Sequence, residues 1–306
     1  MTSSSPDLSD LYRLLEKEER PILPSGERRA ILGCGYVGQA VAQAWKLDGH
    51  DVVGTTTRPE KLPDLAKVVN TPIVFNSADP HSSLEFVAAM DGILVSFAPS
   101  KRMQVELDQY EQTYLGGLQE LIDSTKLKRG DLPTQIVYLS SCGVYGNRGG
   151  ELTSETDPID SQHPVNEILS KAERLIGSAR SPLIKVCVLR LGGIYGPGRD
   201  IPSMLLSAAG NLIQRNGSNV PCWTHLDDIV RGVNFAFDHQ LDDTYNLVND
   251  TQFSGQELTD RLCEKAGLPL AKWLTVDTSD RILNAKVCNL KIKRLGFTFK
   301  HPCMVS

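Results

Sequence analysis

The chain has 306 residues, 41% of them hydrophobic and 23% charged, a balance that excludes wholesale disorder. The formal net charge is -5, from 32 basic and 37 acidic residues, so the sequence lacks the basic surplus typical of nucleic-acid-binding proteins. Its longest apolar stretches, such as 92–98, are far shorter than the roughly 20 residues of a membrane span, and the N-terminus shows no secretory signal pattern. We therefore expect a cytoplasmic protein, with an organelle stroma as the other compartment left open, with no nucleic acid as its partner and no membrane span.

Residues 1–27 are predicted to form an N-terminal helical extension. Ser5 and Pro6 suit the start of a helix, and the prolines that follow Arg20 end it. Its apolar residues recur at i, i+3, i+4 and i+7 and so share one face: Leu8, Leu11, Tyr12 and Leu15. A helix this short is marginal alone, so the face is expected to pack on the same chain or on a protein partner.

From residue 28 onward, short apolar strands alternate with helices. Strands are predicted at 30–32, 51–54, 72–75, 92–98, 135–140 and 185–191, and helices at 36–46, 104–125 and 164–179. Apolar strands separated by helices are typical of parallel strands buried on both faces. The predicted fold class is therefore α/β, a doubly wound parallel Rossmann sheet with a smaller C-terminal substrate lobe.

The first strand runs into a G-x-G-x-x-G pattern. Gly33 permits a tight turn, Gly35 lets the backbone approach a pyrophosphate, and Gly38 allows close packing of helix on strand. The first helical turn, with Tyr36 and Val37, offers N–H groups and a positive dipole end to phosphates. Because the pattern follows a predicted strand and opens a predicted helix, it predicts a dinucleotide site at these five residues.

The end of the second strand bears on the choice of cofactor. An NAD site carries Asp or Glu there for the ribose hydroxyls, but this strand ends in the sequence GTTTR, residues 54–58. Arg58 and hydroxyls such as that of Thr56 suit a 2′-phosphate, because guanidinium is a planar partner for phosphate. NADP is thus favoured over NAD, and the alternative is that Arg58 is only a solvated loop residue.

Four later segments match a known family: YLSSCGVYG at 138–146, RLGGIYGPGR at 190–199, THLDD at 224–228 and YNLV at 245–248. With the glycine pattern, over roughly residues 28–300, the chain resembles the extended short-chain dehydrogenases/reductases, in their epimerase/dehydratase-like branch. The resemblance implies an NAD(P)-binding protein that acts on a small-molecule substrate, and a homodimer is common in the family.

The resemblance also implies a set of hydroxyl, tyrosine and lysine at the active site. Ser141, four residues before Tyr145, stands in the place of the substrate-orienting hydroxyl, and Lys171 in that of the lysine that holds the nicotinamide ribose. The family's tyrosine should stand four residues before that lysine, but Glu167 is there. No tyrosine lies between Tyr145 and Tyr195, so the chain looks like an atypical member without the active-site tyrosine.

This departure leaves the chemistry of the site open. An ionised carboxylate at Glu167 can accept a proton but cannot protonate a substrate. Glu167 and Lys171 therefore form either a structural or cofactor-fixing ion pair, or an acid/base pair of a different kind. Tyr145 or Tyr195 would be another source of the missing phenol, and Cys142 reads as buried filler rather than as a nucleophile.

Two functional hypotheses follow. One is an NADP-dependent oxidoreductase or epimerase-like enzyme, and the other is a catalytically inactive NADP-binding regulator, scaffold or assembly factor. The seven cysteines show no C-x-x-C pair or zinc-type spacing, so no metal site is predicted. The domain prediction is a 1–27 extension, a 28–196 NAD(P)-binding Rossmann domain, and a 197–306 lobe of which about 223–249 returns to the sheet. In that returning segment, Asp227 or Asp228 is predicted to cap a helix that starts near His225.

Overall fold

The computed structural model describes residues 26–79, 81–97, 107–127, 133–276 and 281–305. Seven parallel strands form one sheet in the order β11-β7-β5-β4-β1-β2-β3. The first described strand, β1, lies inside this sheet, and later strands extend the sheet to both edges, which confirms the predicted α/β, doubly wound fold. The strands are β1 (Arg28–Leu32), β2 (Asp51–Thr56), β3 (Thr71–Val74), β4 (Gly92–Val95), β5 (Thr134–Ser141), β7 (Ile184–Leu191) and β11 (Thr244–Leu247).

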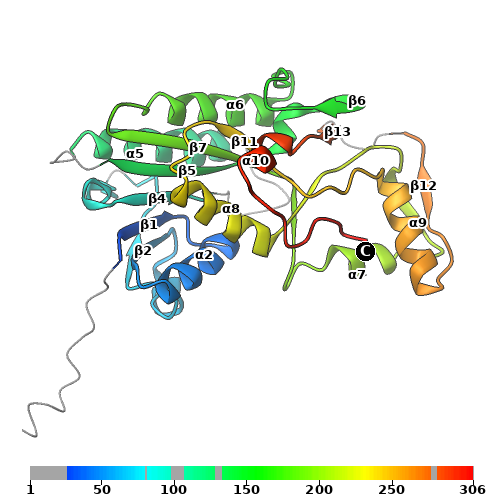
Figure 1. Ribbon diagram of the computed structural model, residues 1–306, viewed down its shortest axis with the longest axis horizontal. Helices are drawn as coiled ribbons and strands as arrows, with labels where there is room; N and C mark the ends of the chain where they lie inside the picture. Colours follow the sequence, from blue (N-terminus) through cyan, green and yellow to red (C-terminus); the bar gives the residue numbers. More distant parts are fainter. Residues whose placement is uncertain (1–25, 80, 98–106, 128–132, 277–280, 306) are drawn as a thin grey trace, which may run out of the picture.

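Helices cover both faces of the sheet, with α5 and α6 on one face and α2 and α8 on the other (Figure 1). Side chains alternate across a strand, so each strand feeds both layers. Ile31 packs beneath α2 and α8, whereas its neighbours Ala30 and Leu32 pack beneath α5 and α6. The helices and turns of the body are α2 (Tyr36–Leu47), η1 (Pro59–Lys61), α3 (Leu62–Leu65), η2 (Glu85–Ala89), α5 (Gly117–Thr125), η4 (Cys142–Tyr145), α6 (Pro164–Gly177) and α8 (Leu226–Asp238).

A smaller lobe lies beside the sheet (Figure 1) and contains α7 (Ile201–Leu206), β9 (Leu212–Asn216), α9 (Gly255–Ala266) and β12 (Lys272–Leu274). Helix α9 starts at a capping box of Ser254 and Glu257, and Gly267 ends it with φ of 65°. Two further pairs lie outside the main sheet: β8 (Gly193–Tyr195) with β10 (Trp223–His225), and β6 (Asn147–Thr153) with β13 (Asn284–Val287).

The C-terminal segment differs from the expectation that 250–306 belongs to the lobe. After β12 the chain returns to the body, where α10 (Leu290–Arg294) packs beside β11. Ile292 and Phe297 join the core layer beneath α2 and α8, and this apolar anchoring explains the return. Beyond α10 the tail runs toward the lobe side of the molecule (Figure 1).

The long helix predicted at 104–125 is described from residue 107 and is divided. Helix α4 (Leu107–Glu111) passes through a π-helical turn, η3 (Gln112–Gly116), into α5. Of the predicted N-terminal extension, all but the last two residues lie outside the described part of the chain. Within that described part, every helix falls short of the length and apolarity that a membrane crossing requires.

Candidate functional site

The glycine-rich turn between β1 and α2 is shaped by close packing. Gly33 has φ of 84°, and a Cβ there would lie 2.7 Å from the Ser96 carbonyl oxygen. A Cβ at Gly38 would lie 3.0 Å from the side chain of Ile31, so helix and strand touch at this point. A Cβ at Gly35 would meet nothing within 4 Å, so its backbone faces open space. The three glycines thus have the local environments that the sequence pattern predicts.

The open side of this turn suits a phosphate. Gly35 is the N-cap of α2, no side chain caps the helix, and the first turn holds no acidic residue. The N–H groups of that turn and the positive end of the helix dipole therefore face an uncrowded surface. Thr55 of β2 stabilises the turn, because its Oγ1 accepts a hydrogen bond of 2.8 Å from the Gly33 N–H. A dinucleotide pyrophosphate fits these residues.

A cavity of about 780 Å³ opens over this turn and the ends of β1, β2 and β4. Five predicted cofactor residues line it: Gly33, Gly35, Tyr36, Thr56 and Arg58. Three others do not, since Val37 is buried in the core, Gly38 packs on β1, and Lys171 lies on α6. Lining residues outside the sequence-predicted set include Gln39, Lys61, Asn76, Ser77, Phe97 and Thr113.

The charge at the edge of the cavity comes from exposed side chains just after β2. Arg58 and Lys61 both line the cavity, and Lys61 follows Arg58 by one turn of η1. Asp64 also lines it, but its carboxylate is engaged by Lys67 at 2.9 Å and by Lys61 at 3.5 Å. The hydrogen bond and charge of Lys67 hold the pKa of Asp64 below its usual value. The strand end itself carries a cation and no carboxylate.

The glycine turn is tied to the loop that follows β8. The Tyr36 hydroxyl donates to the Pro197 carbonyl at 2.7 Å, and the Arg199 guanidinium lies 4.0 Å from the centre of the Tyr36 ring. This loop is the GPGR sequence on which the family resemblance partly rests. The contacts join two sequence motifs that are about 160 residues apart.

The carboxyl end of β5 presents Ser141 next to a tight turn. Its Oγ accepts a hydrogen bond of 3.0 Å from the Gly143 N–H. Cys142 is fully buried, and burial raises the pKa of its thiol, so it is not a thiolate nucleophile. Ser141, which is half-buried, is therefore the polar group that we consider at this strand end.

The two tyrosines considered as substitute phenols are both engaged elsewhere. The buried Tyr145 hydroxyl donates to Asn246 at 2.7 Å and accepts from Arg190 at 2.8 Å. The Tyr195 hydroxyl accepts from the Asn249 amide at 3.2 Å. Burial raises the pKa of both phenols. Neither lines the dinucleotide cavity.

The structure does not bring Glu167 and Lys171 to the cavity. Their side chains are 48% and 44% exposed on α6 and form an i,i+4 ion pair of 3.0 Å. The positions of α6 that face the end of β5 are instead Val165 and Leu169, which pack in the cluster that contains Cys142 and Tyr145. Val165 and Leu169 are four residues apart, as Glu167 and Lys171 are, but both are apolar.

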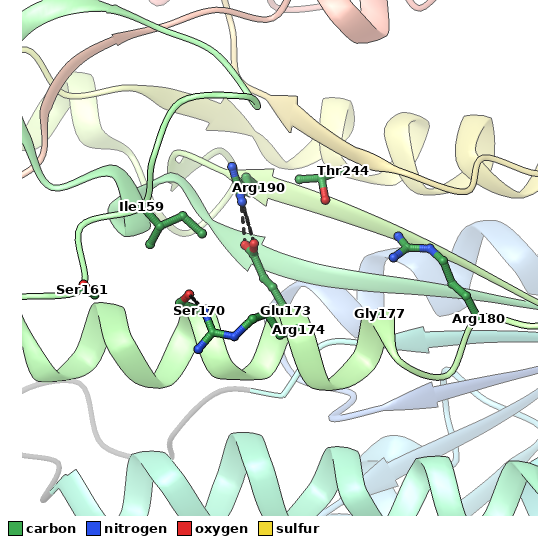
Figure 2. Close-up of a pocket in the computed structure, with 9 residues that line it drawn as sticks. All are labelled: Ile159, Ser161, Ser170, Glu173, Arg174, Gly177, Arg180, Arg190 and Thr244. Carbon is green, nitrogen blue, oxygen red and sulfur yellow. Dashed lines mark hydrogen bonds and ion pairs between the residues drawn. The ribbon is translucent and has the colours of Figure 1, made fainter.

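A second, more open cavity of about 620 Å³ lies between α6, β7 and β11, away from the glycine turn (Figure 2). Glu173 of α6 and Arg190 of β7 face each other in it, with an Nη2–Oε2 distance of 2.7 Å. Burial opposes the charge of Arg190, but the hydrogen bonds and charge of Glu173 outweigh it and raise its pKa. Ser140 also donates to Glu173, at 2.5 Å. The sequence-based reasoning missed this pair, because its members lie 17 residues apart on different elements.

The start of α8 differs from the prediction that an aspartate caps it. The His225 side chain is the cap and accepts from the Asp227 N–H at 3.1 Å, while Asp228 accepts from the N–H groups of Lys300 and His301. Within the described ranges, His225, Asp227 and His301 are close enough to hold a metal ion. One oxygen of the Asp227 carboxylate already lies 2.7 Å from the Lys300 Nζ and 3.0 Å from the His301 Nε2, so it is engaged by side chains of the chain itself.

Known proteins resemble this chain in sequence and in fold. The model of the NAD dependent epimerase/dehydratase family matches residues 30–248. Protein YeeZ of Escherichia coli K12 is 25% identical over 281 residues, which are 89% of this chain and 96% of that protein.

Two solved structures share the fold. The structure of MoeE5 in complex with UDP-glucuronic acid and NAD superposes with a TM-score of 0.71 at 23% identity, covering 90% of this chain and 94% of that one. The human epimerase family protein SDR39U1 (isoform 2) with NADPH has a TM-score of 0.70 at 17% identity, covering 90% and 96%. At these identities the likeness concerns the fold.

Proposed function

The chain belongs to the NAD dependent epimerase/dehydratase family, and from this premise we propose that it binds NADP(H) and lacks the tyrosine–lysine proton relay of its relatives. The observation that carries the first half is the pair of cations, Arg58 and Lys61, at the edge of the cavity over the glycine turn. A 2′-phosphate there would meet a planar guanidinium and an ammonium, where an NAD site presents a carboxylate. The solved relatives include complexes with NAD and with NADPH.

In this proposal different residues of the chain bind each part of the cofactor and the ligand. The first turn of α2 holds the pyrophosphate, Arg58 and Lys61 hold the 2′-phosphate, and the Ser141 hydroxyl orients a ligand at the end of β5. The bound nicotinamide supplies hydride chemistry. Val165 and Leu169 of α6 pack against the turn after β5 and are apolar, and the exposed side chains of Glu167 and Lys171 supply no proton at this strand end.

Titrations of NADPH and NADH into the full chain test the choice of cofactor. NADPH should bind at least tenfold tighter, because charge-assisted hydrogen bonds contribute about 1.5–3 kcal/mol each. Arg58→Ala should remove most of the difference and leave NADH binding unchanged. Lys46→Ala, which changes an exposed cation at the far end of α2, is the matched control. Equal affinities for the two cofactors in the wild type would reject the NADP assignment.

The second half of the proposal concerns turnover. The alternative, an NADP-dependent oxidoreductase or epimerase-like enzyme, is favoured by the position of the Ser141 hydroxyl at the end of β5. Oxidation of NADPH against a panel of small ketones, aldehydes and oxo-acids distinguishes the two. We expect only background rates in the wild type and in Glu167→Gln. Robust wild-type turnover would favour the alternative, and turnover that survives Glu167→Gln would show that a group other than Glu167 moves the proton.

A further inference from the structure

The second cavity, between α6, β7 and β11, is lined mainly by polar side chains (Figure 2). Its volume of about 620 Å³ lies within the range of small-molecule sites. Among its described lining residues, Ile159 alone has a wholly apolar side chain, and the others carry guanidinium, carboxylate or hydroxyl groups except for Gly177. The described residues of this cavity and of the cavity over the glycine turn do not overlap, so the two cavities are separate.

The charge of this lining is positive. It holds three arginines and one carboxylate, namely Arg174, Arg180, Arg190 and Glu173. Both oxygens of Glu173 are engaged, because Arg190 donates to Oε1 at 3.0 Å and to Oε2 at 2.7 Å, and Ser140 also donates to Oε1. Glu173 therefore compensates the charge of Arg190. The other two guanidinium groups determine the charge that a ligand in the cavity meets.

Arg174 of α6 is paired with a neutral group. Its Nη1 donates to the Ser170 Oγ at 2.6 Å, and no carboxylate of the described chain lies within ion-pair distance of it. Ser170 is only 4% exposed, and its hydroxyl donates to no acceptor among the described residues. A guanidinium without a counter-ion and a hydroxyl proton without an acceptor thus line the same cavity, and an oxyanion satisfies both.

Arg180, which follows α6, uses only part of its guanidinium within the described chain. Its Nε donates to Asp242 at 2.8 Å, and its Nη2 donates to the Val186 carbonyl at 2.7 Å. A Cβ on Gly177 would lie 3.0 Å from Nη1, so the glycine leaves room for this nitrogen beside the helix. Gly177 itself lines the cavity, and the N–H groups of Nη1 are therefore donors at its wall.

We propose that the second cavity binds a small phosphorylated molecule. Its phosphate group accepts hydrogen bonds from Arg174 and Ser170, and its polar remainder extends past the Glu173–Arg190 pair toward Arg180 (Figure 2). A phosphate monoester has three strong acceptor oxygens, enough for a guanidinium and a hydroxyl at once. Because the two cavities are separate, this site does not depend on the NADP(H) assignment.

The test titrates the full chain with glycerol 3-phosphate and with glycerol, its uncharged counterpart, by calorimetry or NMR. The wild type should bind the phosphate ester at least tenfold tighter than glycerol. Arg174→Gln should weaken binding of the ester by about tenfold, because it removes a charge-assisted hydrogen bond. Ser170→Ala should cause a smaller loss, since it removes a neutral donor.

Lys171→Gln is the matched control. It removes an exposed cation from the same helix, three residues before Arg174, but Lys171 does not line the cavity. Its affinity for glycerol 3-phosphate should stay within about twofold of the wild type, because charges on an exposed surface contribute little. Equal losses in Lys171→Gln and Arg174→Gln would show that only the overall charge attracts the probe, and this would overturn the proposal.

A further variant tests the Arg180 side of the cavity without changing a charge. Gly177 has no positive φ, so Gly177→Ala keeps the backbone while its methyl group displaces the Arg180 Nη1. It should weaken binding of the ester less than Arg174→Gln does. Circular dichroism of each variant checks that the fold is intact.

Arg58→Ala and added NADPH identify which cavity holds the probe. Neither should change the affinity for glycerol 3-phosphate, and Arg174→Gln should bind NADPH as the wild type does. A loss in Arg58→Ala with none in Arg174→Gln would place the probe at the glycine turn and overturn the proposal. A wild type that does not prefer the ester over glycerol would overturn it as well, whatever the titrations with NADPH and NADH show.

Discussion

Helix α6 carries two ion pairs that differ in burial and in the elements they join, although each pairs a glutamate carboxylate with a basic side chain. The pair of Glu167 and Lys171 joins neighbours on one helix and lies half exposed, with a distance of 3.0 Å. The pair of Glu173 and Arg190 joins the helix to β7, with a distance of 2.7 Å and side chains only 8% and 6% exposed. The spacing of residues drew attention to the first pair, whereas the fold depends on the second.

This comparison shows that an i,i+4 spacing does not determine whether an ion pair faces the core or the solvent. The Glu173–Arg190 pair is part of a network with Ser140 and Tyr145, so each oxygen of the carboxylate has a donor. A buried charge of this kind needs an oppositely charged partner, because removal of one side chain leaves the charge of the other neither paired nor hydrated. The exposed pair has water as a substitute for either partner.

The largest expected effect is at the buried pair. Glu173→Ala should lower the free energy of unfolding by about 3–5 kcal/mol, because it leaves the Arg190 guanidinium buried without its carboxylate. Urea denaturation followed by circular dichroism measures the loss. Replacing both partners by methionine should cost less than Glu173→Ala alone. A loss below about 1 kcal/mol in the single variant would mean that water enters the second cavity and solvates the arginine.

An intermediate effect is expected at Asp227, which binds Lys300 and His301 at the start of α8. Hydrogen bonds from these two side chains lower its pKa to about 2, from an ordinary value of 3.8. A lowered pKa in the folded state stabilises the fold above pH 4, and this contribution is lost as the pH falls from about 4 toward 2.

Asp227→Asn should therefore reduce stability at pH 7 by about 0.2–1 kcal/mol for each half-exposed pair. The difference between variant and wild type should shrink below pH 4, as measured by urea titrations at a series of pH values. A difference that stays constant down to pH 2 would show that the carboxylate is not coupled to Lys300 and His301.

The smallest effect is expected at the exposed pair. Glu167→Gln should change the free energy of unfolding by no more than about 0.2–0.5 kcal/mol, the usual range for an i,i+4 pair on a helix surface. Lys171→Gln should leave the affinity for NADPH unchanged, because the lysine does not line the dinucleotide cavity. A tenfold loss of NADPH affinity in Lys171→Gln would restore this lysine to the cofactor site and remove the contrast between the two pairs.

Local sequence patterns were enough to predict the alternation of strands and helices, the doubly wound sheet and the glycine turn. These features depend on local patterns: apolar strands, helical periodicity, and glycines at a turn that a Cβ would obstruct. Arg58 was also predicted as a cofactor-binding residue, because the position that selects between NAD and NADP lies directly at the end of the second strand. Lys61 could have been predicted with it, since it follows Arg58 by three residues.

The four-residue spacing of charged residues on α6 did not reveal which side of the helix faces the end of β5. A shift of two residues along a helix turns a side chain by about 200°, so 165 and 167 point in nearly opposite directions despite identical spacing to 169 and 171. The apolar stripe of α6, which includes Val165 and Leu169, already marked the inward face, and it is the signal that could have placed Glu167 and Lys171 outside.

Long-range partners were beyond any local pattern. Arg281 lies beside Gly143, and Arg190 pairs with Glu173, because parallel strands and a returning C-terminal segment bring distant residues together. No periodicity in the sequence records such contacts, since they depend on the path of the whole chain rather than on its local conformation.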